Sequence, residues 1–334
     1  MTTVDPARAV VDVITGTWRT QALYAAVKLR LPDHIAAGCG TGERLAAAAE
    51  VGPDAVVRLM RLLTAIGVFG GDDTTGYTLT PVSDLLRDGV PGSMRDMCLL
   101  YGEEFHEAWG ATVPALRTGR SGFEDAFGRT LHQYLADEPD AGPRFLRAMN
   151  AGGSFFAEVA NGHDFGTGTV VDVAGGSGML LSSILLAHQG AHGVLFDREH
   201  MVQVAKEHLT TTVAGDRFDV VSGDFFESVP TGADTYVLSR ILQDWDDRRC
   251  VDLLTTVRRA MRAESARLLV VERVVDEDGA RLLPLLFDLH LMVMAGGRER
   301  TMAGYRSLLA AAGLRLESVR DLALETSLLV ARPV

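Results

Sequence analysis

One segment decides the fold of this chain, and it reads Val170-Val171-Asp172-Val173-Ala174-Gly175-Gly176-Ser177-Gly178. Its first residues favour a buried β-strand, and its glycines predict a tight turn. Residues 179–186 follow and read as the start of a helix. Strand, glycine-rich turn and helix form the first unit of a parallel α/β sheet, where backbone N–H groups of the turn can bind a ligand. A purely structural turn uses glycine in the same way, so this segment alone does not show whether the turn binds a ligand.

Composition indicates a globular protein large enough for two domains. The 334 residues are 47% hydrophobic and 23% charged, with a net charge of −12. The acidic balance argues against a nucleic-acid partner, because such proteins usually carry a basic surface. The three cysteines have neither metal-binding spacing nor an even count, so we expect reduced thiols and no metal site. We see no secretion signal and no apolar segment of about 20 residues, and therefore expect a cytoplasmic protein without a membrane partner.

A mainly helical domain is predicted over residues 1–160. Residues 6–37 have a helical pattern that is apolar on more than one face, which favours burial against a neighbouring element or a second chain. Residues 41–88 then predict two helices and a β-hairpin, a winged-helix-like layout. DNA binding is one reading of such a layout, but several aspartates stud this part of an acidic chain and argue against it.

The second predicted domain covers residues 161–334 and is a doubly wound α/β sheet with helices on both faces. Its strands are predicted at 169–174, 192–196, 217–221, 234–239, 267–272, 314–319 and 327–331. Its helices are predicted at 178–188, 199–210, 247–262, 285–294 and 302–312.

The predicted strand ends carry side chains that suit a nucleoside. Asp197 ends the second strand, 22 positions after Gly175, where an acid can bind a ribose diol. Asp224 and Phe225 follow the third strand, and could bind an adenine amine and stack on its ring. Leu181 stands where the dinucleotide fingerprint has its third glycine, and no Walker lysine is present. An adenosine without a diphosphate, such as S-adenosylmethionine, therefore fits better than NAD or ATP.

The chain resembles the small-molecule O-methyltransferases of the plant caffeic-acid type and their bacterial antibiotic-pathway relatives. The resemblance covers essentially the whole chain and rests on three ordered motifs at 171–178, 242–247 and 296–301. The last motif, Gly-Gly-Arg-Glu-Arg-Thr, is the most distinctive. The family resemblance implies a Rossmann-like methyltransferase domain with a late antiparallel strand. It also implies an intertwined homodimer formed through the N-terminal domain, which would also cover the substrate. The expected partners are S-adenosylmethionine, with S-adenosylhomocysteine as product, and a small aromatic acceptor of secondary metabolism.

Carried over by position, the resemblance implies a set of site residues. The cofactor site would comprise Asp172, Gly175, Gly176, Asp197, Asp224, Phe225, Ser239, Arg240 and Met149. Leu291 stands at a position that lines the acceptor pocket in the family, and His290 beside it could line the pocket or face away. Phe156 and Met294 are further candidates because an apolar lining suits a flat, largely apolar acceptor. Core packing explains these apolar side chains equally well.

The pattern breaks at the general base. The family has a histidine at the position that Gln243 occupies here, whereas Glu272 and Glu299 match the acids that orient that histidine. An amide cannot take a proton at neutral pH, so the contribution of a general base, typically 10²–10⁴-fold, must be absent or come from another group. Transfer to an acidic oxygen by placement alone is one interpretation, and proton removal by His290, Glu272 or Glu299 is a second. Transfer to carbon or nitrogen, a non-methylating activity, and a binding or regulatory role remain further alternatives.

Overall fold

The computed structural model describes residues 5–151 and 153–334, and the chain packs as two compact units. One unit takes in Met1–Glu107 and Tyr134–Gly152, and the other takes in Ala108–Gln133 and Gly153–Val334. The packing therefore does not follow the single boundary predicted at residue 160. Residues 108–133 belong to the second unit, where Gly122 packs so closely on Val293 that an added Cβ would lie 3.0 Å from the valine side chain. The assignment of 1–160 and 161–334 as functional domains stays a prediction.

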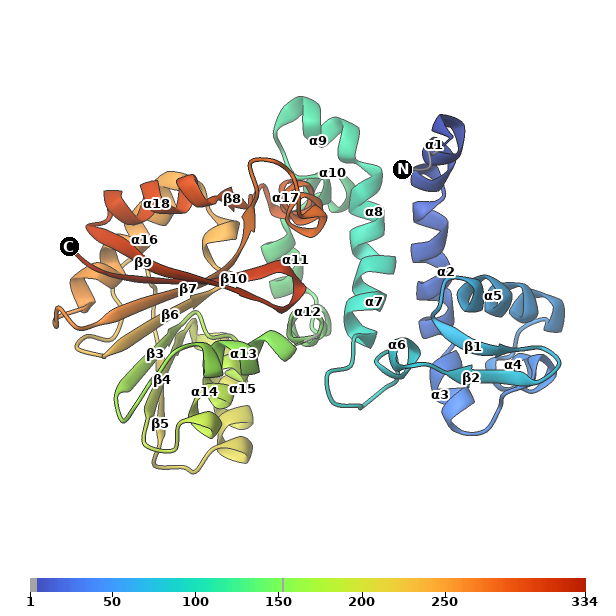
Figure 1. Ribbon diagram of the computed structural model, residues 1–334, viewed down its shortest axis with the longest axis horizontal. Coiled ribbons are helices and arrows are strands. Elements are labelled where there is room, and N and C mark those ends of the chain that lie inside the picture. Colours follow the sequence, from blue (N-terminus) through green and yellow to red (C-terminus); the bar gives the residue numbers. More distant parts are fainter. Residues whose placement is uncertain (1–4, 152) are drawn as a thin grey trace. The chain divides into compact units, whose positions relative to one another are not determined.

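The first unit is helical apart from one hairpin (Figure 1). The hairpin pairs β1 (Phe69–Asp72) with β2 (Gly76–Leu79), as predicted. The predicted helix at 6–37 is instead three helices, because Thr15 ends the first and Arg30 adopts a left-handed backbone with φ of 54°. The helices of this part are α1 (Pro6–Ile14), α2 (Gly16–Lys28), α3 (Leu31–Ala36), α4 (Gly42–Ala49), α5 (Pro53–Ala65), α6 (Pro81–Asp84), α7 (Arg95–Gly102) and α12 (Ala141–Asn150). Helices α8 (Glu104–Gly110) and α11 (Leu131–Asp137) run across the boundary between the units.

In a single chain, the apolar side chains of helix α1 are exposed to water. No residue of α1 is buried, and the exposed fractions reach 81% for Val13 and 61% for Ile14. Trp18 of α2 is 66% exposed. An apolar patch of this kind on one chain is typical of a surface that a partner covers.

The second unit is built on an eight-stranded sheet. Its main path runs β5 (Phe218–Ser222), β4 (His192–Asp197), β3 (Thr169–Val173), β6 (Thr235–Ser239), β7 (Arg267–Val275), β10 (Thr326–Pro333) and β9 (Leu314–Leu322). Strands β3 to β7 are parallel, and β10 is antiparallel to both its neighbours, as the resemblance implied. The short β8 (Arg300–Thr301), which was not predicted, pairs with the end of β7. The chain leaves β3 in one direction and returns on its other side, so β3 marks the switch point where such sheets bind ligands.

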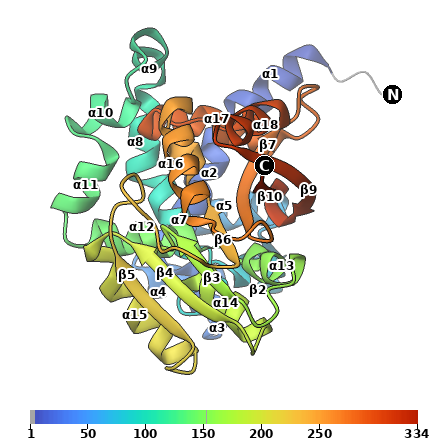
Figure 2. The same cartoon turned by 90° about the vertical axis from the view of Figure 1, so that its left-hand side faces the viewer.

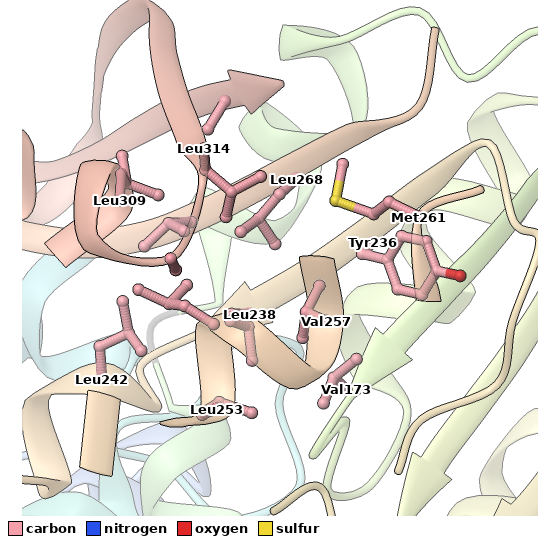
Figure 3. Packing of buried hydrophobic residues seen from close by; sticks show 14 of the residues in the cluster. Val173, Tyr236, Leu238, Leu242, Leu253, Val257, Met261, Leu268, Leu309 and Leu314 are labelled. Atoms are coloured by element: carbon pink, nitrogen blue, oxygen red, sulfur yellow. The ribbon is translucent and has the colours of Figure 1, made fainter. Parts of the chain in front are cut away.

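Alternating side chains of the strands form two cores, one on each face of the sheet. Val171 and Val173 pack on the face covered by α16 (Asp247–Ala260) and α18 (Met302–Ala311). Figure 3 shows this core, with Leu253 and Val257 of α16 among the strand residues. Val170 packs on the opposite face, under α13 (Ser154–Gly162), α14 (Met179–Ala187) and α15 (Glu199–Thr212). The predicted helices on both faces are confirmed, and Figure 2 shows the two layers.

The remaining elements of this unit are α9 (Thr112–Thr118), α10 (Gly122–Phe127), α17 (Leu282–Ala295) and the 3₁₀ turns η1 (Leu242–Asp244) and η2 (Ala323–Glu325). In the described part of the chain, the helices are too short or too polar to cross a bilayer.

Candidate active site

The candidate site lies where β3, β4, β5 and β6 end. Two non-glycine residues there, Ala174 after β3 and Arg240 after β6, have a left-handed backbone with φ of 58°. Strained backbone of this kind persists where the surrounding structure holds it, and it is often found at functional sites.

Asp172 and Gly175 meet under the glycine-rich turn. Asp172 is 1% exposed, and its Oδ2 has no hydrogen-bond partner among the described residues. Burial, together with the nearby charge of Asp197, raises the pKa of Asp172 to about 7. A Cβ on Gly175 would stand 2.7 Å from Asp172 Oδ2, so only glycine fits at that position.

Asp197 is tied to the glycine-rich turn. Its Oδ2 accepts a hydrogen bond from the Gly176 N–H at 2.8 Å, and its Oδ1 accepts from the Arg198 N–H at 2.6 Å. Burial raises the pKa of Asp197, while these two backbone donors lower it. Because each carboxylate oxygen has two lone pairs, Asp197 can still accept further hydrogen bonds.

Asp224 and Phe225 are fixed by neighbours that the sequence did not reveal. Arg198 places a guanidinium nitrogen 3.1 Å from Asp224 Oδ2, and the Phe226 N–H donates to Oδ1 at 2.9 Å. The Phe225 ring packs edge-on against Phe226, with 4.7 Å between the ring centroids. The guanidinium of Arg249 lies 3.4 Å from the centre of the Phe226 ring.

Ser239 and Arg240 follow the neighbouring strand. The Ser239 Oγ is buried and has no hydrogen-bond partner within residues 5–151 and 153–334. The Arg240 guanidinium lies over the Phe155 ring, 5.0 Å from its centre, and 5.8 Å from the centre of Phe156. Phe156 itself is 4% exposed and belongs to the core under α13.

Gln243 lies on η1, which a buried acid and a buried arginine hold in place. Glu272 accepts hydrogen bonds from the N–H groups of Ile241 at 2.9 Å and Leu242 at 2.8 Å. Arg300 donates to the carbonyls of Leu242 at 2.8 Å and Trp245 at 2.7 Å. The Gln243 Oε1 is buried and finds no hydrogen-bond partner in the described structure.

The Gly-Gly-Arg-Glu-Arg-Thr motif forms the wall behind η1. Gly296 ends α17 with φ of 75°. Gly297 lies so close to the Gln243 carbonyl oxygen that an added Cβ would stand 2.4 Å from it, and the Arg298 N–H donates to that oxygen at 2.8 Å. Thr301 caps α18 by accepting from the Gly304 N–H at 3.2 Å. Gly297 and Arg298 of the motif therefore pack against the Gln243 backbone.

Three acids gather at this point. Burial, the leading cause, raises the pKa of Asp244 to about 7 and raises the pKa values of Glu272 and Glu299 as well. The charge of Asp244 adds to the shift at Glu272, and that of Glu272 adds to the shift at Glu299. The positive charge of Arg273, 3.8 Å from Glu299, lowers the pKa of Glu299 and so opposes this shift. Perturbed acids clustered at one strand end are typical of functional sites. No group of three acidic, histidine or cysteine side chains in the described residues is arranged to hold a metal ion.

Helix α17 carries the other predicted pocket residues. The His290 Nδ1 accepts a hydrogen bond from the Trp109 indole N–H at 3.1 Å. Burial, with the charge of Arg273, lowers the pKa of His290 to about 4. The buried Met294 lines a cavity of about 300 Å³, whereas Phe156, His290 and Leu291 do not. The cavity is also lined by Gly119, Arg120, Ser121, Glu124, Thr130, Leu131, His132, Ala295 and Gly296. Met149 lies half-buried on α12 in the first unit, and its place beside the cofactor stays a prediction.

Two family profiles match the chain. The O-methyltransferase domain matches residues 109–315, and the O-methyltransferase dimerisation domain matches residues 11–88. The chain is 44% identical to 3-amino-4-hydroxybenzoate 4-O-methyltransferase of Streptomyces cremeus, over 97% of this chain and 89% of that one. It is 43% identical to phenazine-1-carboxylate N-methyltransferase of Pseudomonas aeruginosa, over 97% of both chains.

A solved structure with bound cofactor product is also similar. It is CalO1, a methyltransferase of calicheamicin biosynthesis, in its S-adenosylhomocysteine-bound form. The TM-score is 0.88 at 33% identity, and the alignment covers 100% of both chains.

Proposed function

This chain belongs to the family of S-adenosylmethionine-dependent O-methyltransferases, and from that premise we propose that it methylates an oxygen atom of an aromatic secondary metabolite. The observation that carries the proposal is the set of buried, unpartnered polar atoms at the switch point. Asp172 and Ser239 lie near the ends of the adjacent strands β3 and β6, and Gln243 lies just beyond β6. The unpartnered atoms are Asp172 Oδ2, Ser239 Oγ and Gln243 Oε1. Such atoms are costly unless a ligand satisfies them.

The residues at the strand ends fit S-adenosylmethionine. The glycine turn lets a ligand approach the backbone after β3, and Asp197 would accept hydrogen bonds from the ribose hydroxyls. Asp224 and the edge-packed Phe225 would border the adenine, and Ser239 and Arg240 the methionine end. The cofactor supplies a methyl group on a positively charged sulfur, which is a good leaving group.

Catalysis would rest on placement, because the three predicted alternative bases, His290, Glu272 and Glu299, are poor bases. Burial and the neighbouring negative charges raise the pKa values of Glu272 and Glu299, which favours their protonated forms, and a protonated carboxyl cannot accept a further proton. His290 has a lowered pKa, and its Nδ1 lone pair is already used by Trp109. Proximity and orientation can contribute about 7–11 kcal/mol to lowering a barrier. An acceptor oxygen that is ionised in solution needs no base in the site.

Transfer to nitrogen is a second candidate, because a neutral aromatic amine attacks through its lone pair and loses its proton afterwards. An unpartnered Gln243 Oε1 could accept a hydrogen bond from such an N–H group. The similar phenazine-1-carboxylate enzyme is named as an N-methyltransferase, which favours keeping this candidate. Transfer to carbon and a non-methylating activity stay predictions.

We also propose that the protein acts as a homodimer. The dimerisation profile covers residues 11–88, and the exposed apolar face of α1 begins just before it. A cytoplasmic location and the absence of nucleic-acid and membrane partners stay predictions from the sequence.

The test combines labelled S-adenosylmethionine with a panel of hydroxy- and aminoarenes. Label in an ether or ester indicates transfer to oxygen, whereas label in an N-methyl or C-methyl group assigns the alternatives. Calorimetry with S-adenosylhomocysteine, on the wild type and on Asp197→Ala, tests the cofactor site separately. Exposed Asp216→Ala serves as the matched control. A protein that binds no S-adenosylhomocysteine would contradict the proposal.

A further inference from the structure

Helix α17 is capped by a side chain from a distant part of the chain. Its first turn reads Leu282-Leu283-Pro284-Leu285, and the side chain of Arg281 before it carries only donors. The first N–H groups of an α-helix lack partners within that helix, so they need acceptors from elsewhere. Glu325 supplies one, because its Oε2 accepts a hydrogen bond from the Leu283 N–H at 3.0 Å. A carboxylate at this end of the helix also interacts favourably with the helix dipole.

Glu325 lies in η2, the turn between β9 and β10, and the backbone of this turn is strained. Leu324 and Glu325 both have a left-handed backbone, with φ of 56° and 53°. This conformation is costly for residues other than glycine, and it persists where surrounding contacts hold it. One such contact comes from α13, where Glu158 Oε2 accepts a hydrogen bond from the Ala323 N–H at 2.7 Å. In addition, Leu322 before the turn is buried in the core under α13.

The turn therefore connects α13 with α17. Figure 1 shows the end of the β9–β10 hairpin, in red, between these two helices. Both carboxylates are half-buried, so less water competes for the N–H groups than on an open surface. Because each helix is bonded to the same short turn, a shift of one helix would be passed through the turn to the other.

Both helices also reach the candidate active site. On α13, the rings of Phe155 and Phe156 lie 5.0 Å and 5.8 Å from the guanidinium of Arg240. Beyond the other end of α17, Gly297 packs against the Gln243 carbonyl oxygen. With a rise of about 1.5 Å per residue, α17 is a rod of about 20 Å between η2 and this contact. Its position at the η2 end therefore determines where its other end meets η1.

We propose that Glu158 and Glu325 are positioning residues, which hold α13 and α17 at the spacing that the acceptor needs. The inference rests on the proposed function, because it takes these helices as parts of the acceptor pocket. Each carboxylate acts through the N–H group that it binds, without touching the acceptor. Losing either bond would release the turn from one helix and let both helices shift. The binding of the acceptor would then weaken more than the methyl transfer itself.

Alanine and glutamine at each position test the kinetic consequence. Glu158→Ala and Glu325→Ala remove the accepting oxygen, whereas Glu158→Gln and Glu325→Gln keep an oxygen that can accept from the same N–H group. The acceptor is the hydroxy- or aminoarene of the panel above that the wild type methylates most efficiently. We expect each alanine variant to raise KM for this acceptor about fivefold, the size of one lost hydrogen bond. The kcat value and the Kd of S-adenosylhomocysteine should stay within about twofold of the wild type.

The glutamine variants should match the wild type in KM, because they keep the bond. Exposed Glu277→Ala is the matched control and should also leave KM unchanged. If an alanine variant does not fold, aspartate takes its place, because the shorter side chain keeps the charge but withdraws the oxygen.

Hydrogen exchange followed by mass spectrometry tests the connection without any acceptor. Glu325→Ala removes the bond to α17, and we expect peptides from α13 to exchange about threefold faster as well. Glu158→Ala removes the bond to α13, and peptides from α17 should show the reciprocal effect. A cap that acts on one helix only would leave the exchange of the other helix unchanged.

Each outcome bears on the inference. Unchanged exchange in the second helix, an unchanged KM in the alanine variants, or glutamine variants that behave like alanine overturns it. If the wild type methylates no arene of the panel but binds S-adenosylhomocysteine, the acceptor class is wrong. Reciprocal exchange then still supports the connection, and its absence overturns it. If S-adenosylhomocysteine does not bind to the wild type, the proposed function itself is contradicted, whereas the exchange result still decides whether the two helices are connected.

Discussion

Replacing Asp172 with asparagine should remove a pH-dependent part of the stability of this protein. Burial and the charge of Asp197 raise the pKa of Asp172 from 3.8 to about 7, and the side chain is 1% exposed. A carboxyl whose folded pKa is raised stabilises the folded state below its unfolded pKa, and this contribution is lost as the pH rises through the folded pKa. As the pH falls from 8 to 5, this residue should therefore raise the free energy of unfolding of the wild type by about 3 kcal/mol, since each pH unit below 7 contributes about 1.4 kcal/mol.

Urea unfolding followed by circular dichroism, at pH 5, 6, 7 and 8 without ligand, measures this effect. The free energy of unfolding of the wild type minus that of Asp172→Asn should rise by about 3 kcal/mol from pH 8 to pH 5. Asp216→Asn, an exposed surface change, is the control and should show no comparable trend. A difference that stays constant with pH would refute the account of Asp172 as a buried acid whose proton is retained near neutrality.

Three further changes test the site. We expect Asp197→Ala to weaken S-adenosylhomocysteine binding at least tenfold in calorimetry, about 1.4 kcal/mol, and an unchanged dissociation constant would argue against its contact with the ribose. Gly297→Ala should push the Gln243 carbonyl out of place and lower turnover more than cofactor affinity, and wild-type kinetics would show that the close packing is unimportant. Arg300→Lys should lose at least one of the two hydrogen bonds to the carbonyls of Leu242 and Trp245, and should lower the free energy of unfolding by about 1–3 kcal/mol. An unchanged melting temperature in thermal unfolding would contradict the role of these hydrogen bonds.

The strands of the sheet could be predicted because their residues are buried on one or both faces. Val170 and Val171 face opposite cores, and this continuous apolar run is typical of parallel strands. The acids at the strand ends could be located for the same reason, since the end of a buried run is visible in a sequence. The break at Arg30 was missed, although Pro32 lies two positions later in the first turn of α3, where proline is typical of a helix start.

The environment of the site could not be predicted because long-range contacts create it. The bond from Trp109 to His290 joins residues 181 positions apart and deprives the histidine of its free lone pair. Arg198, which follows a neighbouring strand, forms an ion pair with Asp224. Arg300 belongs to a motif that could be recognised by its resemblance to the family. Its hydrogen bond to the Leu242 carbonyl of η1 could not be predicted from the sequence.

A crystal structure of this protein with S-adenosylhomocysteine tests the central claim most directly. The account predicts a nucleoside at the end of β3, with its ribose hydroxyls on Asp197 and its sulfur toward Gln243. A structure in which the nucleoside binds elsewhere, or in which side chains fill that place, would contradict it.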